Sequence, residues 1–311
     1  MSRLPIAALA LDSPRGQAGV MRWDESHDSP DVVDRRGDAP ARAGGGLGGV
    51  LYLVPWLLRM PYGWVVVLGG AVFYFARGFL SGGVDPHHAQ GSALPNTGAR
   101  AETPEVHFVS FVLDDAQASW EQQFASQGRA YRHAKLVLYT DATDTGCGFG
   151  DAATGPFYCP TDERVYIDLG FFRELSGRLG ARGQFAEAYV VAHELGHHVQ
   201  KLLGISQRVD SMRSTEGATG ASVRLELQAD CFAGIWAHST EQRDLLESGD
   251  IESAVGAAAA VGDDRLQRMT KGTVTPESWT HGSSQERVRW FRRGLETGSI
   301  NSCDTFSATQ L

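Results

Sequence analysis

The stretch VVAHELGHHVQ, residues 190–200, decides how this chain is interpreted, because three histidines and one glutamate fall within six positions. The surrounding sequence contains helix formers nearly throughout and no proline, and Gly204 is a natural C-terminal stop. On such a helix His193 and His197 lie one turn apart on a single face, so two nitrogen ligands can share one ion. Glu194 lies about 100° further round, within reach of a water on that ion. The pattern indicates a metal site with its own general base, and the alternative is a polar helix that is rich in histidine.

A second helical segment, SVRLELQADCFAGIWAHS at residues 222–239, supplies the further ligand that such a site needs. Glu226 and Asp230 are four residues apart and share one face of this helix. Glu226 offers a carboxylate oxygen, and Asp230 can accept the other N–H of a ligating histidine. We therefore predict one Zn²⁺ per chain, bound by His193, His197 and Glu226.

Hydrolysis of a peptide bond is the reaction that this site predicts. Three protein ligands leave the fourth position of zinc for a water, whose pKa then falls toward ~7. Glu194 takes the proton and passes it to the leaving amine. Two alternatives stay open: a membrane-anchored zinc hydrolase of another amide, such as one of the cell wall, and a non-catalytic binding or scaffold protein that keeps zinc for structure. The scaffold would need a fourth protein ligand. His198 points away from the metal face and is expected to pack or to hydrogen-bond.

The elements around these helices predict an α+β fold, mostly helical with a small sheet. An amphipathic helix is expected from about Asp114, because apolar residues follow at steps of four. KLVLYT (135–140) and RVYIDLGFF (164–172) are β-branched and aromatic, and both are predicted strands. The second strand is either the sheet edge on which an extended substrate aligns or an ordinary buried strand.

The composition limits the kinds of partner that the protein can bind. The 311 residues are 42% hydrophobic and 21% charged, which is ordinary for a globular protein. The formal charge of -9 and the sequence pI near 5.6 come with no cluster of Lys and Arg. Because phosphate binding needs such a cluster, we expect no nucleic-acid partner.

The first third of the chain differs from the rest. Residues 1–61 are rich in Arg, Asp and Gly and predict a disordered cytoplasmic tail. Residues 81–104 are Gly, Pro and polar, which is typical of a flexible linker. The zinc metallopeptidase domain is therefore expected at residues 105–306.

Between tail and linker lies YGWVVVLGGAVFYFARGFL, residues 62–80, in which Arg77 is the only charge. At ~1.5 Å per residue this segment can just cross a bilayer as one helix, with a buried core helix as the alternative. Several arginines precede the segment, and after Arg77 none follows until Arg100. The positive-inside rule then predicts a single-pass protein with a cytoplasmic N-terminus, a periplasmic or extracellular domain, and a peptide or protein substrate outside the cytoplasm.

Whether the four cysteines form disulfides depends on this topology. In an exported domain, Cys147 and Cys159 would pair and close a loop worth about 3 kcal/mol on a chain-entropy estimate, and Cys231 with Cys303 would form the second pair. Four buried free thiols are the alternative if the domain is not exported.

Several blocks together carry a family resemblance: CGFGDAATGPFYCP, VYIDL, AYVVAHELGHHVQKLLGIS, SVRLELQADCFAGIWAH, GDIESAVGAAAAVGDDRLQ, THGSSQERVRWFRRGLETG and CDTF. Through them the chain from about Met21 resembles the neutral zinc metallopeptidases of bacteria, and the blocks cover nearly all of residues 111–306. The resemblance implies a membrane-anchored protein with a zincin-like, minimal gluzincin domain, in which the Glu of the ExxxD segment, here Glu226, is the third zinc ligand. It implies no particular substrate.

A donor opposite the metal is still needed, because zinc alone leaves the oxyanion of a tetrahedral intermediate only partly compensated. THGSSQERVRW is similar to the His-containing stretch that precedes a helix with an Arg in related membrane gluzincins. The resemblance implies that His281 faces the substrate, with Arg287 as its support or substitute. The alternative for His281 is a surface-loop histidine.

Overall fold

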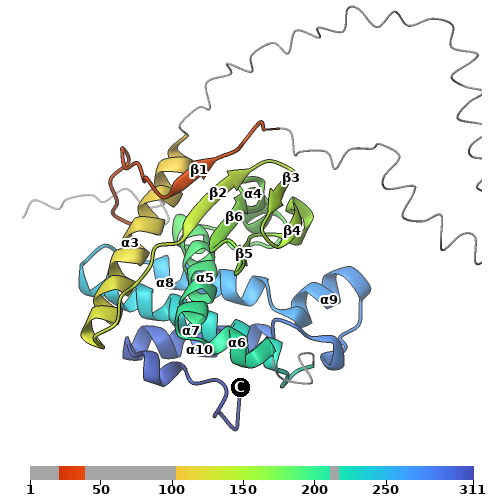
Figure 1. Ribbon diagram of the computed structural model, residues 1–311. Helices are drawn as coiled ribbons and strands as arrows, with labels where there is room; N and C mark the ends of the chain where they lie inside the picture. Colours follow the sequence, from red (N-terminus) through yellow and green to blue (C-terminus); the bar gives the residue numbers. More distant parts are fainter. Residues whose placement is uncertain (1–20, 39–102, 211–216) are drawn as a thin grey trace, which may run out of the picture. The chain divides into compact units, whose positions relative to one another are not determined.

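The computed structural model describes residues 21–38, 103–210 and 217–311 (Figure 1). The predicted membrane helix at 62–80 and nearly all of the linker at 81–104 lie outside these residues. Among the helices that are described, none combines the length and the apolar character needed to cross a bilayer.

The described strands form two small sheets. The strands are β1 (Val32–Asp34), β2 (Lys135–Tyr139), β3 (Ala142–Thr145), β4 (Gly148–Asp151), β5 (Phe157–Cys159) and β6 (Arg164–Asp168). The larger sheet has the order β1-β2-β6-β5, in which β1, β2 and β6 are parallel and β5 is antiparallel to β6. The smaller sheet pairs β3 with β4 in antiparallel fashion. Together with the helices below, these sheets confirm the α+β class.

Strand β6 lies between β2 and β5, so of the two alternatives it is the ordinary buried strand and not the sheet edge. Val165, Tyr166 and Ile167 are fully buried, because β6 is paired on both sides and covered on both faces. The strand also ends at Asp168, and the aromatic residues after it begin helix α4 (Gly170–Gly177). Within the described residues, β5 has a strand partner on one side only.

Residues 21–36 belong to the folded domain, so the prediction of disorder at 1–61 is wrong for them. Strand β1 pairs in parallel with β2, and Met21 is 1% exposed in the core. A chain that crossed a bilayer once between residues 38 and 103 could not place β1 and β2 in one sheet.

The described helices surround one buried helix, α5. They are α3 (Pro104–Ser126), α4, α5 (Gln184–Leu202), α6 (Ile205–Asp210), α7 (Ala221–Gln242), α8 (Asp250–Ala260), α9 (Asp263–Lys271) and α10 (Ser284–Thr297), with short 3₁₀ turns η1 (Ala152–Thr154), η2 (Pro276–Ser278) and η3 (Ile300–Cys303). Helix α5 packs against α3, α7 and α8 and against β5 and β6. Figure 1 shows it beneath the sheet, with α7 and α10 further from the strands.

Helix α3 begins ten residues before the predicted start at Asp114. Its first half contributes Phe108, Val109 and Val112 to the core, each at most 1% exposed. Because apolar residues cover most faces of this half, they show no helical period. At the other end of the chain the domain continues past residue 306, since Leu311 is 6% exposed.

Helices α7 and α10 approach each other closely at Gly294. A Cβ at this position would lie 1.9 Å from the carbonyl oxygen of Cys231, so only glycine allows the contact. The same cysteine forms a disulfide with Cys303 in η3, and a second disulfide joins Cys147 to Cys159. All four cysteines are paired in the two expected combinations. The packing of α10 on α7 brings its first turns toward the predicted ligands.

Candidate metal centre

Helices α5 and α7 bring the predicted ligands together. His193 and His197 on α5 have ring centroids 5.0 Å apart and perpendicular ring planes. The two helices are so close that a Cβ at Gly196 would lie 3.0 Å from the carbonyl oxygen of Ala229. The glycine between the two histidines therefore allows Glu226 on α7 to reach both of them.

The donor atoms of His193, His197 and Glu226 lie within 4.8 Å of one another. The Oε2 atom of Glu226 is 3.2 Å from His193 Nε2, and its Oε1 atom is 3.4 Å from His197 Nε2. Donors at about 2.1 Å from a tetrahedral zinc are roughly 3.4 Å apart, so this spacing fits the ion. Burial lowers the pKa of His193, yet Asp230 and Glu226 raise it to about 9. A positive charge is therefore favoured at this point.

The second ring nitrogen of each histidine has an acceptor of its own. His193 Nδ1 lies 2.9 Å from Asp230 Oδ1, and His197 Nδ1 lies 2.9 Å from Gln200 Oε1. The Gln200 amide is oriented because its Nε2 donates to the Leu225 carbonyl at 2.7 Å. With both protons on Nδ1, the lone pairs of both Nε2 atoms are free to bind a metal.

Asp230 is fully buried, and both of its oxygens are bonded. Arg287 donates from Nε to Oδ2 at 2.8 Å and from Nη2 to Oδ1 at 2.9 Å, and the Tyr189 hydroxyl donates to Oδ1 at 2.5 Å. Burial opposes ionisation of this carboxyl, but Arg287 and His193 lower its pKa to about 2. The group is thus held as a carboxylate that accepts the Nδ1 proton of His193.

Arg287, predicted as the support or substitute of His281 at the substrate, lines the same cavity as the ligand cluster. Its side chain is only 4% exposed. Its guanidinium donates to Asp230, to the Tyr189 hydroxyl at 3.2 Å and to the Val261 carbonyl at 3.3 Å. A guanidinium engaged in this way holds Asp230, and through it His193, whereas its predicted role at the substrate stays a prediction.

Glu194 is 7% exposed and lines the cavity that contains the ligand cluster. It is not one of the three clustered donors. Burial raises the pKa of its carboxyl, while His193 and His197 oppose the rise. A carboxylate with a raised pKa is a more effective base near neutral pH.

His281 lies in the loop before α10 and forms part of the same cavity wall. Asp263, the first residue of α9, holds this loop. Its Oδ2 accepts the backbone N–H groups of Thr280, His281 and Gly282 at 2.7, 2.6 and 3.1 Å, and its Oδ1 lies 3.3 Å from His281 Nδ1. Burial lowers the pKa of His281, but Asp263 and Glu226 raise it overall. These contacts hold the ring at the cavity wall, although its side chain is 49% exposed, as in the surface-loop alternative.

The cavity has a volume of about 740 Å³, within the range of small-molecule sites. Phe157 and Tyr158 of β5 line it on one side. Phe171 after β6, and Leu266 and Met269 on α9, also line it, and Met269 is 45% exposed. The cavity thus combines an apolar lining with the polar cluster.

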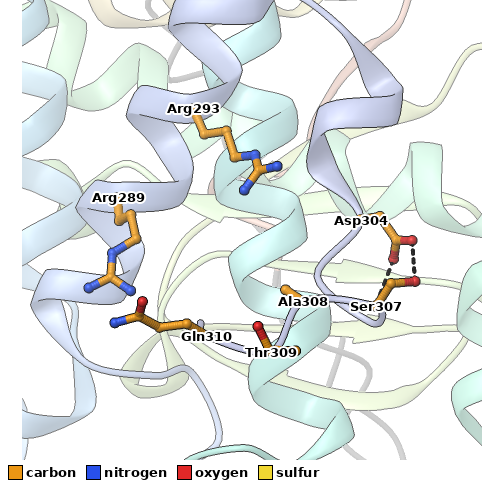
Figure 2. Close-up of a pocket in the computed structure, with 7 residues that line it drawn as sticks. All are labelled: Arg289, Arg293, Asp304, Ser307, Ala308, Thr309 and Gln310. Atoms are coloured by element: carbon orange, nitrogen blue, oxygen red, sulfur yellow. Dashed lines mark hydrogen bonds between the residues drawn. The ribbon is translucent and has the colours of Figure 1, made fainter.

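A second cavity of about 690 Å³ is formed by α10 and the residues that follow η3 (Figure 2). It is lined by Arg289, Arg293, Asp304, Ser307, Ala308, Thr309 and Gln310. Asp304 accepts hydrogen bonds from the hydroxyl and the backbone N–H of Ser307. Within the described part of the chain, the two cavities share no lining residue, and no histidine lines this one. The candidate chemistry therefore belongs to the first cavity.

Three residues of the site were not identified from the sequence: Tyr189, Gln200 and Asp263. Tyr189 is four residues before His193, and Gln200 is three residues after His197, so helical spacing could have placed both beside the ligands. Asp263 is 18 residues from its partner His281 and on another element. No local pattern connects them.

Comparison with known proteins adds to this geometry. The model of the family described as "Putative neutral zinc metallopeptidase" matches residues 21–306. The chain is 43% identical over 300 residues to "Uncharacterized protein YpfJ" of Escherichia coli (strain K12). This alignment covers 92% of this chain and 99% of that relative. It is 48% identical over 192 residues to "Uncharacterized protein Rv2575" of Mycobacterium tuberculosis (strain ATCC 25618 / H37Rv), 58% of this chain and 65% of that relative. No solved structure matches the chain.

Proposed function

The chain belongs to the neutral zinc metallopeptidase family whose model it matches, and we propose that it is a zinc-dependent peptidase that hydrolyses peptide bonds. One observation carries the proposal. Three donors from His193, His197 and Glu226 converge within 4.8 Å, and the buried carboxyl of Glu194 lines the same cavity without joining them.

Each residue of the site has a distinct part in the proposed reaction. Zinc, when held by the three donors, supplies a Lewis acid and lowers the pKa of a bound water to about 7. Glu194 takes a proton from the attacking water and delivers it to the leaving amine. His281 donates a hydrogen bond to the substrate oxygen on which negative charge develops. Asp230 keeps the proton of His193 on Nδ1 throughout.

A catalytic role is better supported than a structural zinc site. A structural site is closed by four protein ligands. Among the residues that the structure describes, the group that includes His193 has only three members. Those three donors open into a cavity of about 740 Å³, which a structural site does not need.

Strand β5 supports a peptide as the substrate. It lies at the end of the described sheet and lines the cavity through Phe157 and Tyr158. An extended peptide can add to a sheet edge through main-chain hydrogen bonds, which requires no particular side chain. We therefore propose that the substrate aligns on β5 in place of the predicted β6.

The two disulfides support a site of action outside the cytoplasm, in the periplasm or the extracellular space. Attachment to a bilayer through residues 62–80 is proposed from the sequence alone. Because β1 pairs with β2, we place residues 21–36 on the same side of the bilayer as the catalytic domain.

The test compares the full-length protein with its Glu194→Gln variant. We expect the variant to bind about one zinc per chain and to lose hydrolysis of denatured casein, because Glu194 activates water without binding the metal. Proteomic analysis of exported proteins should then show cleavage products in the wild-type strain only. A zinc-loaded variant with normal turnover contradicts the proposal, as does a wild type that cleaves only cell-wall amides.

A further inference from the structure

His198 connects the metal-binding helix to the sheet. It is fully buried on α5, directly after the ligand His197. Its Nδ1 atom lies 2.9 Å from the Tyr158 hydroxyl, and its Nε2 atom lies 2.6 Å from the carbonyl oxygen of Arg132. Tyr158 is the middle residue of β5, and Arg132 lies just ahead of β2. One imidazole therefore joins α5 to two separate parts of the sheet.

The partners of His198 define its tautomer. A carbonyl oxygen only accepts, so Nε2 carries the proton and donates it to Arg132. Nδ1 is then the acceptor, and the Tyr158 hydroxyl donates to it. The rings of Tyr131 and Tyr158 also meet the imidazole edge-on, with centroids 5.6 and 5.5 Å away. The ring is fixed by two hydrogen bonds and two aromatic contacts.

An outer polar layer holds the same parts of the fold. Arg132 binds Glu163 through Nε at 2.6 Å and Nη2 at 2.7 Å, and Lys201 lies 3.0 Å from Glu163. Lys201 also donates to the carbonyl of Pro160. These groups join the turn between β5 and β6 to the last turn of α5. Exposed ion pairs contribute little, so the buried hydrogen bond of His198 is the stronger constraint on β5.

We propose that the hydrogen bond between Tyr158 and His198 sets the position of β5 relative to the metal-binding helix, and that His198 is a positioning residue for extended substrates. This inference rests on the proposed peptidase function. A peptide that adds to β5 takes its position from that strand, whereas the zinc ligands take theirs from α5 and α7. The distance from the scissile carbonyl to the metal therefore depends on how β5 is held on α5.

Small displacements matter in such an arrangement, since misplacing reacting groups by 1 Å can cost about 100-fold in rate. A substrate too short to pair with β5 finds the metal by direct contact and does not depend on the strand. Loss of the hydrogen bond should therefore affect long substrates more than short ones, which a general loss of folding would not do.

The test uses the full-length protein and two variants. Tyr158→Phe removes the hydroxyl that donates to His198 and keeps the ring. Tyr131→Phe is the matched control, because the Tyr131 ring also packs on His198 but its buried hydroxyl has no hydrogen-bond partner among the described residues. The substrates are a quenched-fluorescent peptide library of decamers and a blocked dipeptide amide. Zinc content and the visible spectrum of the cobalt-substituted protein report on the metal site.

For Tyr158→Phe we expect kcat/KM on the decamers to fall about 10-fold further than on the dipeptide, as the loss of one buried hydrogen bond of about 1.4 kcal/mol implies. Zinc content and the cobalt spectrum should not change, and Tyr131→Phe should match the wild type. An equal loss on both substrates, or no loss, overturns the inference.

A second measurement separates this inference from the proposed function. The ¹⁵N chemical shift of His198 Nδ1 reports whether it accepts a hydrogen bond, even in a protein that cleaves nothing. We expect the shift to change in Tyr158→Phe and not in Tyr131→Phe, and an unchanged shift in both overturns the hydrogen bond itself. If the wild type hydrolyses neither substrate, the peptidase proposal is wrong, and the positioning role fails with it.

Discussion

Arg287 and Asp230 form a bidentate ion pair that solvent does not reach, with Nε–Oδ2 at 2.8 Å and Nη2–Oδ1 at 2.9 Å. The same carboxylate faces Nδ1 of His193 at 2.9 Å. One buried anion therefore connects α10 to the ligand cluster. Removing one partner of a buried pair costs about 3–5 kcal/mol, because the remaining charge is uncompensated.

Arg287→Ala should therefore weaken zinc binding by roughly 10- to 100-fold, the range for residues that orient a ligand. Competition against a chelator measures this affinity. Arg292→Ala is the control, since Arg292 is an exposed arginine on the same helix. If Arg287→Ala keeps full zinc affinity and loses only turnover, Arg287 acts on the substrate and our assignment is wrong.

Replacing Glu226 should weaken zinc binding more than replacing Asp230. Glu226→Ala removes a donor that lies 3.2 and 3.4 Å from the two Nε2 atoms, so the variant should lose zinc under mild chelation. Asp230→Ala should keep the three donors and bind zinc about 10- to 100-fold more weakly. Zinc content after dialysis against a weak chelator checks both. The reverse order would show that ligand and supporting residue are exchanged.

Asp263→Asn should move the alkaline limit of activity to lower pH. If the proton of the neutral ring stays on Nδ1, which faces Asp263, His281 can donate from Nε2 only while the ring is protonated, so activity should fall as pH rises through its pKa. Burial lowers that pKa, but Asp263 and Glu226 raise it overall. Loss of the Asp263 charge lowers it again, while the Asn oxygen can still accept the loop N–H groups. The pH profile of kcat/KM measures the shift.

Asp264→Asn is the matched control for that profile. Asp264 is the neighbouring carboxylate, and it accepts hydrogen bonds from the backbone and the hydroxyl of Ser284. Its replacement should leave the alkaline limit where it is. Equal shifts in the two variants, or none in either, would remove His281 from the proposed chemistry.

The ligand cluster was predictable because it depends on local spacing. His193 with His197, and Glu226 with Asp230, are pairs four residues apart, and a helix of either sequence places each pair on one face. Only the approach of α7 to α5 had to be assumed. The structure shows that Gly196 allows this approach. The role of this glycine can be recognised in the sequence only once the partner helix is known.

Other features depend on contacts between distant segments. Strand β1 has three residues in a charged segment, and its pairing with β2 spans about a hundred positions. A strand this short shows no alternation that reveals it. Arg287 looks like a surface residue of an amphipathic helix until Asp230 is placed opposite it. The order of the strands likewise follows from tertiary packing, so β6 could not be distinguished from an edge strand.

The disulfides lead to a prediction about the native protein. Alkylation of protein taken from its native cells, followed by mass spectrometry, should find no free thiol among the four cysteines. Replacing Cys147 and Cys159 together by serine should lower the free energy of unfolding by about 3 kcal/mol, because the loop between them is no longer closed. Four freely alkylated thiols in the folded protein would contradict the proposed export.

The last prediction concerns the side of the membrane on which residues 21–36 lie. They carry β1, which pairs with β2 of the folded domain, and a sheet cannot form across a bilayer. We therefore expect Glu25→Cys and Glu241→Cys, two exposed positions on the N-terminal segment and at the end of α7, to react equally with a membrane-impermeant maleimide in intact cells or spheroplasts. Labelling of both only after lysis places the whole domain in the cytoplasm and contradicts export. Labelling of position 241 alone restores the single-pass orientation with a cytoplasmic N-terminus, and β1 could then not be part of the sheet in the cell.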